Sequence, residues 1–117
     1  MLDGVTANPG SHSQAPRVLD AGADPFAPLP VIEAFLDRRL RTPRRDQPGA
    51  LAEAMQYAAL GGGKRARPLL AWHACVAAGA PGEASLSAGA AVELIHAFSL
   101  VHDDLPALDN DDVRRGR

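Results

Sequence analysis

Aromatic and strand-forming residues are scarce in this chain. Aromatic residues make up only 4% of its 117 residues, and threonine and isoleucine are also few. Alanine dominates an apolar fraction of 46%. Alanine is the best helix former, whereas threonine, isoleucine and tyrosine are typical of strands. The composition therefore predicts an all-α fold and disfavours a sheet protein.

Cysteine is almost absent, since Cys75 is the only one. An internal disulfide is excluded, and a free thiol fits a reducing compartment. We therefore expect a cytoplasmic protein.

Long apolar runs and strong net charge are missing as well. No uninterrupted apolar run approaches the roughly 18 residues that span a bilayer, and no basic segment followed by an apolar core marks a secretory signal. The net charge of −2 gives no general attraction to nucleic acid. We expect neither an integral membrane segment nor a nucleic-acid partner.

Two regions are distinguished by their patterns. Residues 1–25 are rich in small residues, aspartate and proline without apolar periodicity, which predicts a disordered leader. Residues 26–117 form the predicted domain. Apolar residues recur there at helical spacing in four segments, which predict helices at about 31–42, 48–60, 68–78 and 83–105.

A glycine run and three cations lie between the second and third of these helices. The segment is Gly61-Gly62-Gly63-Lys64-Arg65-Ala66-Arg67. Glycines let backbone N–H groups approach an anion, and a helix N-terminus adds positive potential. A nucleotide P-loop is excluded, because Lys64 is followed by Arg65 and not by Ser or Thr. Diphosphate binding and a solvated basic turn after a helix C-cap both remain open.

Five carboxylates crowd the last part of the chain, ahead of three arginines. They are Asp103, Asp104, Asp109, Asp111 and Asp112. Clustered carboxylates bind hard cations such as Mg²⁺, and arginines grip phosphates through bidentate hydrogen bonds. The run predicts a metal-bound polyphosphate site. The alternative is a solvated acidic turn.

The fourth predicted helix places polar side chains on one face. His96, Ser99 and Asp103 are separated by three and four residues, which aligns them. Pro106 cannot continue the helical hydrogen bonds, so we expect a kink or bulge that swings Asp109 back toward Asp103. His102 lies off this face and is interpreted as structural.

Two motifs resemble those of the trans-polyprenyl diphosphate synthases, most of all the bacterial farnesyl-forming members. The first is Gly-Gly-Lys-Arg-Ala-Arg-Pro over 62–68. The second starts with Glu-Leu-Ile-His at 93–96 and includes His-Asp-Asp-Leu-Pro-Ala-Leu-Asp over 102–109. Joint occurrence at this spacing is highly specific. The resemblance implies the N-terminal helices of an isoprenoid-synthase-type bundle, within a prenyltransferase that joins isopentenyl diphosphate to an allylic diphosphate.

The resemblance also implies a role for each polar residue of the motifs. Asp103 and Asp109 would bind Mg²⁺ that bridges the allylic diphosphate, with Asp104 in support. The residues that would hold the substrate diphosphates are Lys64, Arg67, His96 and Arg115 for isopentenyl diphosphate, and Arg114 for the allylic one. The three aspartates, Lys64 and Arg114 are the implied catalytic set.

Product length in that family depends on side-chain bulk below the aspartate-rich motif. Phe98 lies five residues before Asp103, beside Ser99. An aromatic residue there resembles the floor of the farnesyl-forming enzymes and implies a short-chain product, farnesyl diphosphate first and geranyl diphosphate second, over longer ones. The alternative is that Phe98 is an ordinary core residue.

The chain shows no match to the second aspartate-rich motif that faces the first in that family. We therefore expect an incomplete bundle. An inactive fragment, one half of a split enzyme and a magnesium–diphosphate-binding module without turnover all remain open. Members of the family are usually homodimers, which implies a homodimer for the full-length protein.

Overall fold

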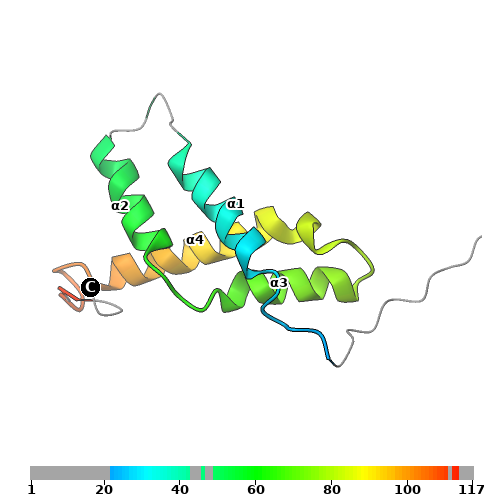
Figure 1. The fold of residues 1–117 in the computed structure, drawn as a ribbon. Coiled ribbons are helices and arrows are strands. Elements are labelled where there is room, and N and C mark those ends of the chain that lie inside the picture. The colour runs from blue at the N-terminus through cyan, green and yellow to red at the C-terminus, as the bar shows by residue number, and fades with distance from the viewer. Residues whose placement is uncertain (1–21, 43–45, 47–48, 111, 114–117) are drawn as a thin grey trace, which may run out of the picture.

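The computed structural model describes residues 22–42, 46, 49–110 and 112–113, and it confirms the all-α prediction. Within those residues the regular structure is entirely helical (Figure 1). The elements are α1 (Leu29–Arg41), α2 (Gly49–Leu60), α3 (Ala66–Ala77), the short 3₁₀ helix η1 (Gly82–Ser85) and α4 (Leu86–Asp103).

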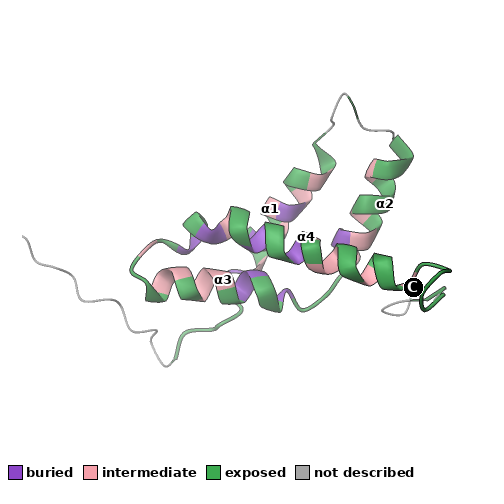
Figure 2. Ribbon diagram, turned by 180° about the vertical axis from the view of Figure 1, so that it is seen from behind, coloured by how far each residue is buried: buried purple, intermediate pink, exposed green. Residues whose placement is uncertain are grey.

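The four helices form two layers. Helices α3 and α4 run side by side in opposite directions, joined by a turn and η1, and α1 and α2 stand against them as a second pair (Figure 1). The buried cluster lies where the pairs meet. Ile32 and Leu36 of α1 contact Leu69 of α3 and Ala90 of α4 there. Figure 2 shows buried residues in the first half of α4, in the first turn of α3 and on α1.

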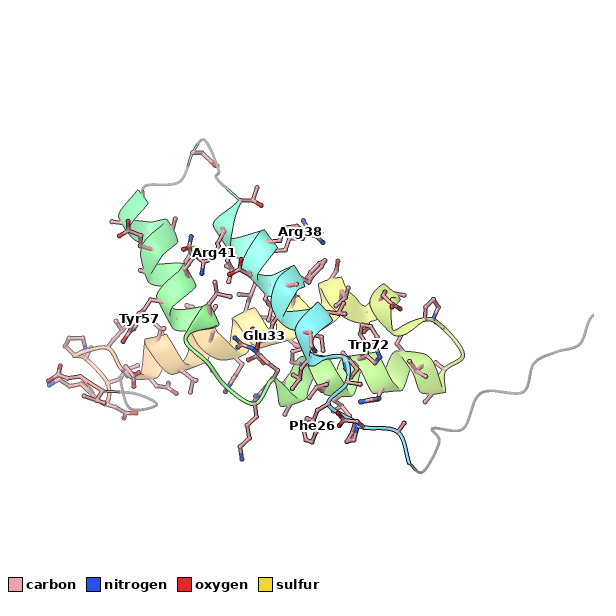
Figure 3. The ribbon with its side chains drawn as sticks, viewed as in Figure 1. Phe26, Glu33, Arg38, Arg41, Tyr57 and Trp72 are labelled. Atoms are coloured by element: carbon pink, nitrogen blue, oxygen red, sulfur yellow. The ribbon has the colours of Figure 1, made fainter. Side chains whose placement is uncertain are left out.

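Two glycines let α4 and the η1 turn approach α3 closely. A Cβ atom on Gly89 would lie 3.2 Å from Pro68 Cα, so the small residue sets the distance between the two helices. A Cβ atom on Gly82 would fall inside the indole ring of Trp72. Figure 3 shows Trp72 on α3, directed toward the start of α4. Both glycines therefore serve close packing against α3.

Several helix ends differ from the prediction, and two of them lie beside the predicted site. Helix α3 begins at Ala66, two residues before Pro68, because proline is tolerated anywhere in a first turn whose N–H groups have no helical partner. Helix α4 ends at Asp103 and not near Leu105. Pro106 has no N–H to donate to the carbonyl of His102, so the helix stops where a kink was expected.

The segment before α1 is tied to the helical body. The Phe26 N–H donates to Asp24 Oδ1 at 2.9 Å, and His73 Nε2 lies 2.8 Å from the carbonyl oxygen of Pro25. The leader predicted for residues 1–25 falls mostly outside the described residues, and its boundary stays a prediction.

Helix α4 carries many exposed apolar side chains. Val92, Ile95, Phe98 and Val101 are all more than two-fifths exposed. Among the described residues, one segment is long and apolar enough to cross a membrane, Gly82–Asp103, with a mean hydropathy of 1.5. This segment is not an uninterrupted apolar run, so it was not predicted from the sequence. Its length and composition are weak evidence for a membrane span, since core helices of soluble proteins have the same properties. The absence of an integral membrane segment stays a prediction.

Candidate functional site

The glycine-rich loop between α2 and α3 is the first part of the candidate site. Gly62 and Gly63 have φ values of 95° and 138°, which favour glycine because no Cβ is present. The Gly62 N–H donates to the Leu60 carbonyl at 2.8 Å and closes the end of α2. Beyond this turn the chain leads directly into the cations.

Arg65 follows these glycines and is buried between helices. Its side chain is 1% exposed. Nε donates to Glu33 Oε1 at 2.6 Å and Nη1 donates to Glu93 Oε1 at 2.9 Å. The two carboxylates come from α1 and α4, so this arginine joins three elements. In Figure 3 Glu33 points from α1 toward the loop that leads into α3.

The electrostatics of Arg65 follow from this burial. Desolvation acts to lower the pKa of the guanidinium, because it penalises the charged form. The hydrogen bonds that Arg65 donates to Glu33 and Glu93, together with the negative charges of these carboxylates, outweigh desolvation and raise the pKa above its ordinary value. Arg65 therefore stays charged across any ordinary pH range.

The loop and α4 together enclose an open hollow of about 630 Å³. Residues 61–67 line one side, and Glu93 and His96 line the other. Lys64 and Arg67 are exposed, whereas His96 is half-buried. The structure thus brings together three of the four residues implied for isopentenyl diphosphate, from two segments far apart in the chain. A pocket with two cations and an imidazole can bind a diphosphate by charge-assisted hydrogen bonds.

The aspartates lie at the C-terminal end of α4 and in the turn that follows it, where the chain turns back. The Asp109 N–H donates to the Asp103 carbonyl at 3.0 Å, and the Asn110 N–H donates to the Leu105 carbonyl at 3.2 Å. A backbone hydrogen bond therefore holds Asp103 and Asp109 close together in space. The chain does turn back at Pro106 as expected. A turn after the end of the helix produces this reversal, and not a kink within the helix.

The donor atoms of this turn suit a hard cation. Asp103 and Asp109 are exposed and supply carboxylate oxygens. Within the described residues no group of three Asp, Glu, His or Cys side chains is close enough to hold a metal ion by itself. Mg²⁺ commonly uses one or two carboxylates and completes its shell with water and substrate phosphates. Two adjacent aspartates fit that pattern.

The remaining residues of the implied site have distinct surroundings. Phe98 is 67% exposed, and its ring centroid lies 5.8 Å from that of His102. Phe98 is not part of the buried cluster of the described residues, and its role stays a prediction. Ser99 donates to the His96 carbonyl at 2.8 Å, within its own helix. Arg114 and Arg115 lie outside the described residues.

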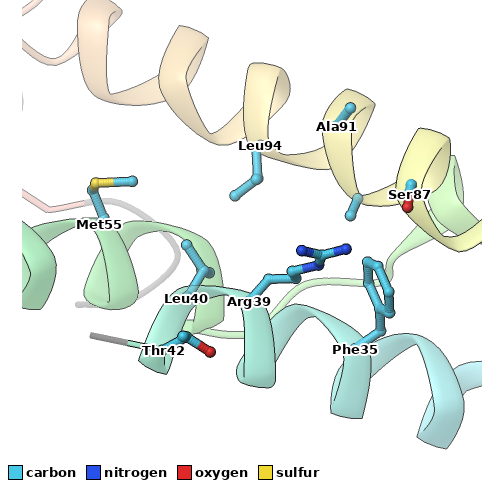
Figure 4. Close-up of a pocket in the computed structure, with 9 residues that line it drawn as sticks. Phe35, Arg39, Leu40, Thr42, Met55, Ser87, Ala91 and Leu94 are labelled. Carbon is cyan, nitrogen blue, oxygen red and sulfur yellow. The ribbon is translucent and has the colours of Figure 1, made fainter. Parts of the chain in front are cut away.

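A second hollow lies between α1, α2 and α4. It measures about 550 Å³ and is mostly apolar, with Phe35, Leu40 and Leu94 among its lining residues. Figure 4 shows Arg39 extending from α1 into this space. Its guanidinium lies 5.1 Å from the Phe35 ring centroid, a cation–π distance.

Sequence reasoning missed the buried pair of Arg65 and Glu93. The signal was present, because Glu93 is the only Asp, Glu, Lys or Arg between residues 84 and 102 of a long apolar helix. A lone carboxylate on such a helix needs a buried partner, because an unpaired buried charge is costly. Which of the three cations supplies that partner is decided by the fold.

Residues 48–117 match the family model described as polyprenyl synthetase. A geranylgeranyl pyrophosphate synthase from Capsicum annuum is 52% identical over 71 residues, which cover 61% of this chain and 19% of that protein. A geranylfarnesyl diphosphate synthase from Leucosceptrum canum is 41% identical over 117 residues, which cover 97% of this chain and 31% of that protein. The chain therefore spans less than a third of the length of either relative.

Both relatives are named as chloroplastic, as is the large subunit 1 of a heterodimeric geranylgeranyl pyrophosphate synthase from Arabidopsis thaliana. This finding contradicts the predicted cytoplasmic location. The lone cysteine indicated a reducing compartment, and that chemistry does not distinguish one reducing compartment from another.

Proposed function

Because the chain belongs to the polyprenyl synthetase family, we propose that it carries the diphosphate-binding part of a prenyltransferase. The reaction would join isopentenyl diphosphate to an allylic diphosphate, dimethylallyl or geranyl, in isoprenoid biosynthesis. The proposal rests on one observation. The fold places Lys64 and Arg67 of the loop on the same hollow as His96 of α4.

The chemistry requires charge neutralisation at the allylic diphosphate. Its C–O bond breaks, the electron pair leaves with pyrophosphate, and an allylic cation remains. Mg²⁺, when bound, supplies the Lewis acidity that offsets the developing negative charge. In this proposal Asp103 and Asp109 hold the metal, Asp104 supports them and Arg114 contacts the allylic diphosphate.

The second substrate is held on the other side of the site. Lys64, Arg67 and His96 bind the diphosphate of isopentenyl diphosphate, with Arg115 beside them. The double bond of that substrate attacks the allylic cation, a new C–C bond forms, and a proton is lost. No protein nucleophile is needed. In the full-length protein a homodimer would carry two such sites.

Product length is the finer part of the proposal. Phe98 and Ser99 lie on α4 one turn before Asp103, where an aromatic ring would limit the growing chain and favour farnesyl diphosphate. The relatives are named for longer products, geranylgeranyl and geranylfarnesyl diphosphates. Our expectation of farnesyl diphosphate rests on the aromatic ring of Phe98, so replacement of Phe98 by alanine should shift the product toward longer chains.

A binding measurement tests whether the hollow that Lys64, Arg67 and His96 share binds a diphosphate. Isothermal titration calorimetry with isopentenyl diphosphate should show binding to the chain, and Lys64→Ala should weaken it about tenfold, because a charge-assisted hydrogen bond is lost. Arg41→Ala is a matched control, since Arg41 is an exposed cation on α1 paired with Asp37. Equal binding by the Lys64→Ala variant and the unaltered chain would contradict the assignment.

A product assay tests turnover. The chain is incubated with geranyl diphosphate, isopentenyl diphosphate and Mg²⁺, and prenyl products are separated by chain length. Farnesyl diphosphate is expected from the unaltered chain. Geranylgeranyl diphosphate as its main product would overturn the role given to Phe98.

Binding of magnesium and diphosphate without turnover is the alternative function. The exposure of Phe98 favours it, because the described residues do not enclose a prenyl chain around that ring. Diphosphate binding with no product in the assay would support this alternative for the 117-residue chain.

A further inference from the structure

Arg65 adopts an unusual backbone conformation. Its φ of 50° and ψ of 32° place it in the left-handed region, although it has a Cβ atom. That conformation is unfavourable for a residue with a Cβ atom and persists only where the surroundings enforce it. The surroundings here are the carboxylates of Glu33 and Glu93, which hold the guanidinium from two sides.

These contacts determine where the neighbouring cations lie. The Arg65 side chain is directed inward, between α1 and α4, and Lys64 and Arg67 remain exposed. Glu93 lies three residues before His96, so both are on the same face of α4. The ion pair between Arg65 and Glu93 therefore attaches the loop to the turn of α4 that carries His96.

From this geometry we propose that Arg65 is a positioning residue for the diphosphate hollow. Its ion pairs with Glu33 and Glu93 hold residues 61–67 so that Lys64 and Arg67 face the same space as His96. Arg65 does not contact the ligand itself. The inference rests on the proposed diphosphate-binding function of this hollow.

A competing explanation is that Arg65 only adds positive charge to the hollow. The two explanations predict opposite signs for one substitution. Glu93 lines the hollow, so Glu93→Gln removes a negative charge beside the ligand. Charge alone predicts tighter anion binding by this variant. Positioning predicts weaker binding, because Arg65 loses a charged partner and the loop is less firmly held.

The experiment measures binding of inorganic pyrophosphate by calorimetry without Mg²⁺, so that the aspartates contribute little. The variants are Glu93→Gln and Arg65→Lys, which keeps the charge but cannot reach both carboxylates with a planar fork. Matched controls are Glu83→Gln, an exposed carboxylate in η1, and Arg41→Lys on α1. Circular dichroism establishes that each variant keeps its helix content.

Both test variants should raise the dissociation constant for pyrophosphate about fivefold or more, and both controls should stay within about twofold. Tighter binding by Glu93→Gln, or unchanged binding by Arg65→Lys, would overturn the proposal.

Amide hydrogen exchange without ligand separates this inference from the proposed function. The Leu69 N–H donates to the Arg65 carbonyl at 3.1 Å, and the Gly62 N–H lies in the same loop. Arg65→Lys should accelerate exchange at both amides, whereas Arg41→Lys should not. If the unaltered chain binds no pyrophosphate, the proposed function of the hollow fails. Unchanged exchange in Arg65→Lys shows instead that Arg65 does not position the loop.

Discussion

At the scale of single residues, three cations with similar sequence surroundings have different environments in the fold. Lys64 and Arg67 are exposed on the hollow, and Arg65 between them is buried against two carboxylates. The run of positive charges over 64–67 thus contains one residue, Arg65, whose charge serves contacts between helices. Its buried ion pairs need both partners, because a buried charge left without one is strongly destabilising.

Small residues are the other decisive feature at this scale. Gly82 lies against the indole of Trp72, with no room for a methyl group. We expect Gly82→Ala to lower the free energy of unfolding by about 1–3 kcal/mol, because the ring must move out of a packed position. Urea denaturation followed by circular dichroism measures this change.

Gly49→Ala is the control for that substitution. Nothing lies within 4 Å of a Cβ built on Gly49, at the first position of α2. Its effect should stay within about 0.5 kcal/mol. Equal losses in the two variants would show that the Trp72 contact does not limit residue 82.

At the scale of elements, the end of α4 decides where the aspartates lie. The helix stops at Asp103, and the turn that follows returns Asp109 to the Asp103 carbonyl. In a continuous helix these two residues would lie on different faces, because six residues is not a whole number of turns. The break is therefore part of the proposed metal site.

Replacing Pro106 by alanine should lengthen α4. Alanine restores an N–H that can donate to the His102 carbonyl, and it is the best helix former. Asp109 then rotates away from Asp103. We expect added helical signal in circular dichroism and weaker Mg²⁺-dependent diphosphate binding. Ala107→Gly is a control that changes the turn without restoring that N–H. Retained Mg²⁺-dependent binding in a lengthened helix would contradict the role of the break.

At the scale of the whole molecule, much apolar surface is exposed. Leu70 of α3 is 72% exposed and Ile95 of α4 is 67% exposed, while the buried cluster is small. Monomeric proteins seldom leave large contiguous apolar areas in water. The described residues therefore have helix faces that need further partners.

We expect the 117-residue chain to self-associate, with an associated fraction that rises with protein concentration. The doubly substituted Leu70→Lys, Ile95→Lys chain should sediment closer to a monomer with unchanged helix content, because charges on these faces oppose apolar contact. Analytical ultracentrifugation measures the difference. Ala88→Lys, on an exposed position of α4, is the control for added charge. A monomeric unaltered chain at all concentrations would contradict this prediction.

The sequence by itself determined the helices and the family. Alanine-rich periodic segments specify helices through local propensity, and prolines and glycines mark where they end, so the four helices were predicted to within a few residues. The spacing of the loop and aspartate motifs predicted the family, and the family comparison confirmed it. The site residues themselves stay predictions.

The tertiary structure alone decided which charges are buried. The pairing of Arg65 with Glu33 and Glu93 joins residues 32 and 28 positions apart, and no local propensity encodes such a contact. The tertiary structure also placed the loop opposite His96 and left Phe98 exposed to solvent. Local backbone preferences act over one or two turns. Burial, and with it the division between ligand-binding and structural cations, depends on how the helices pack.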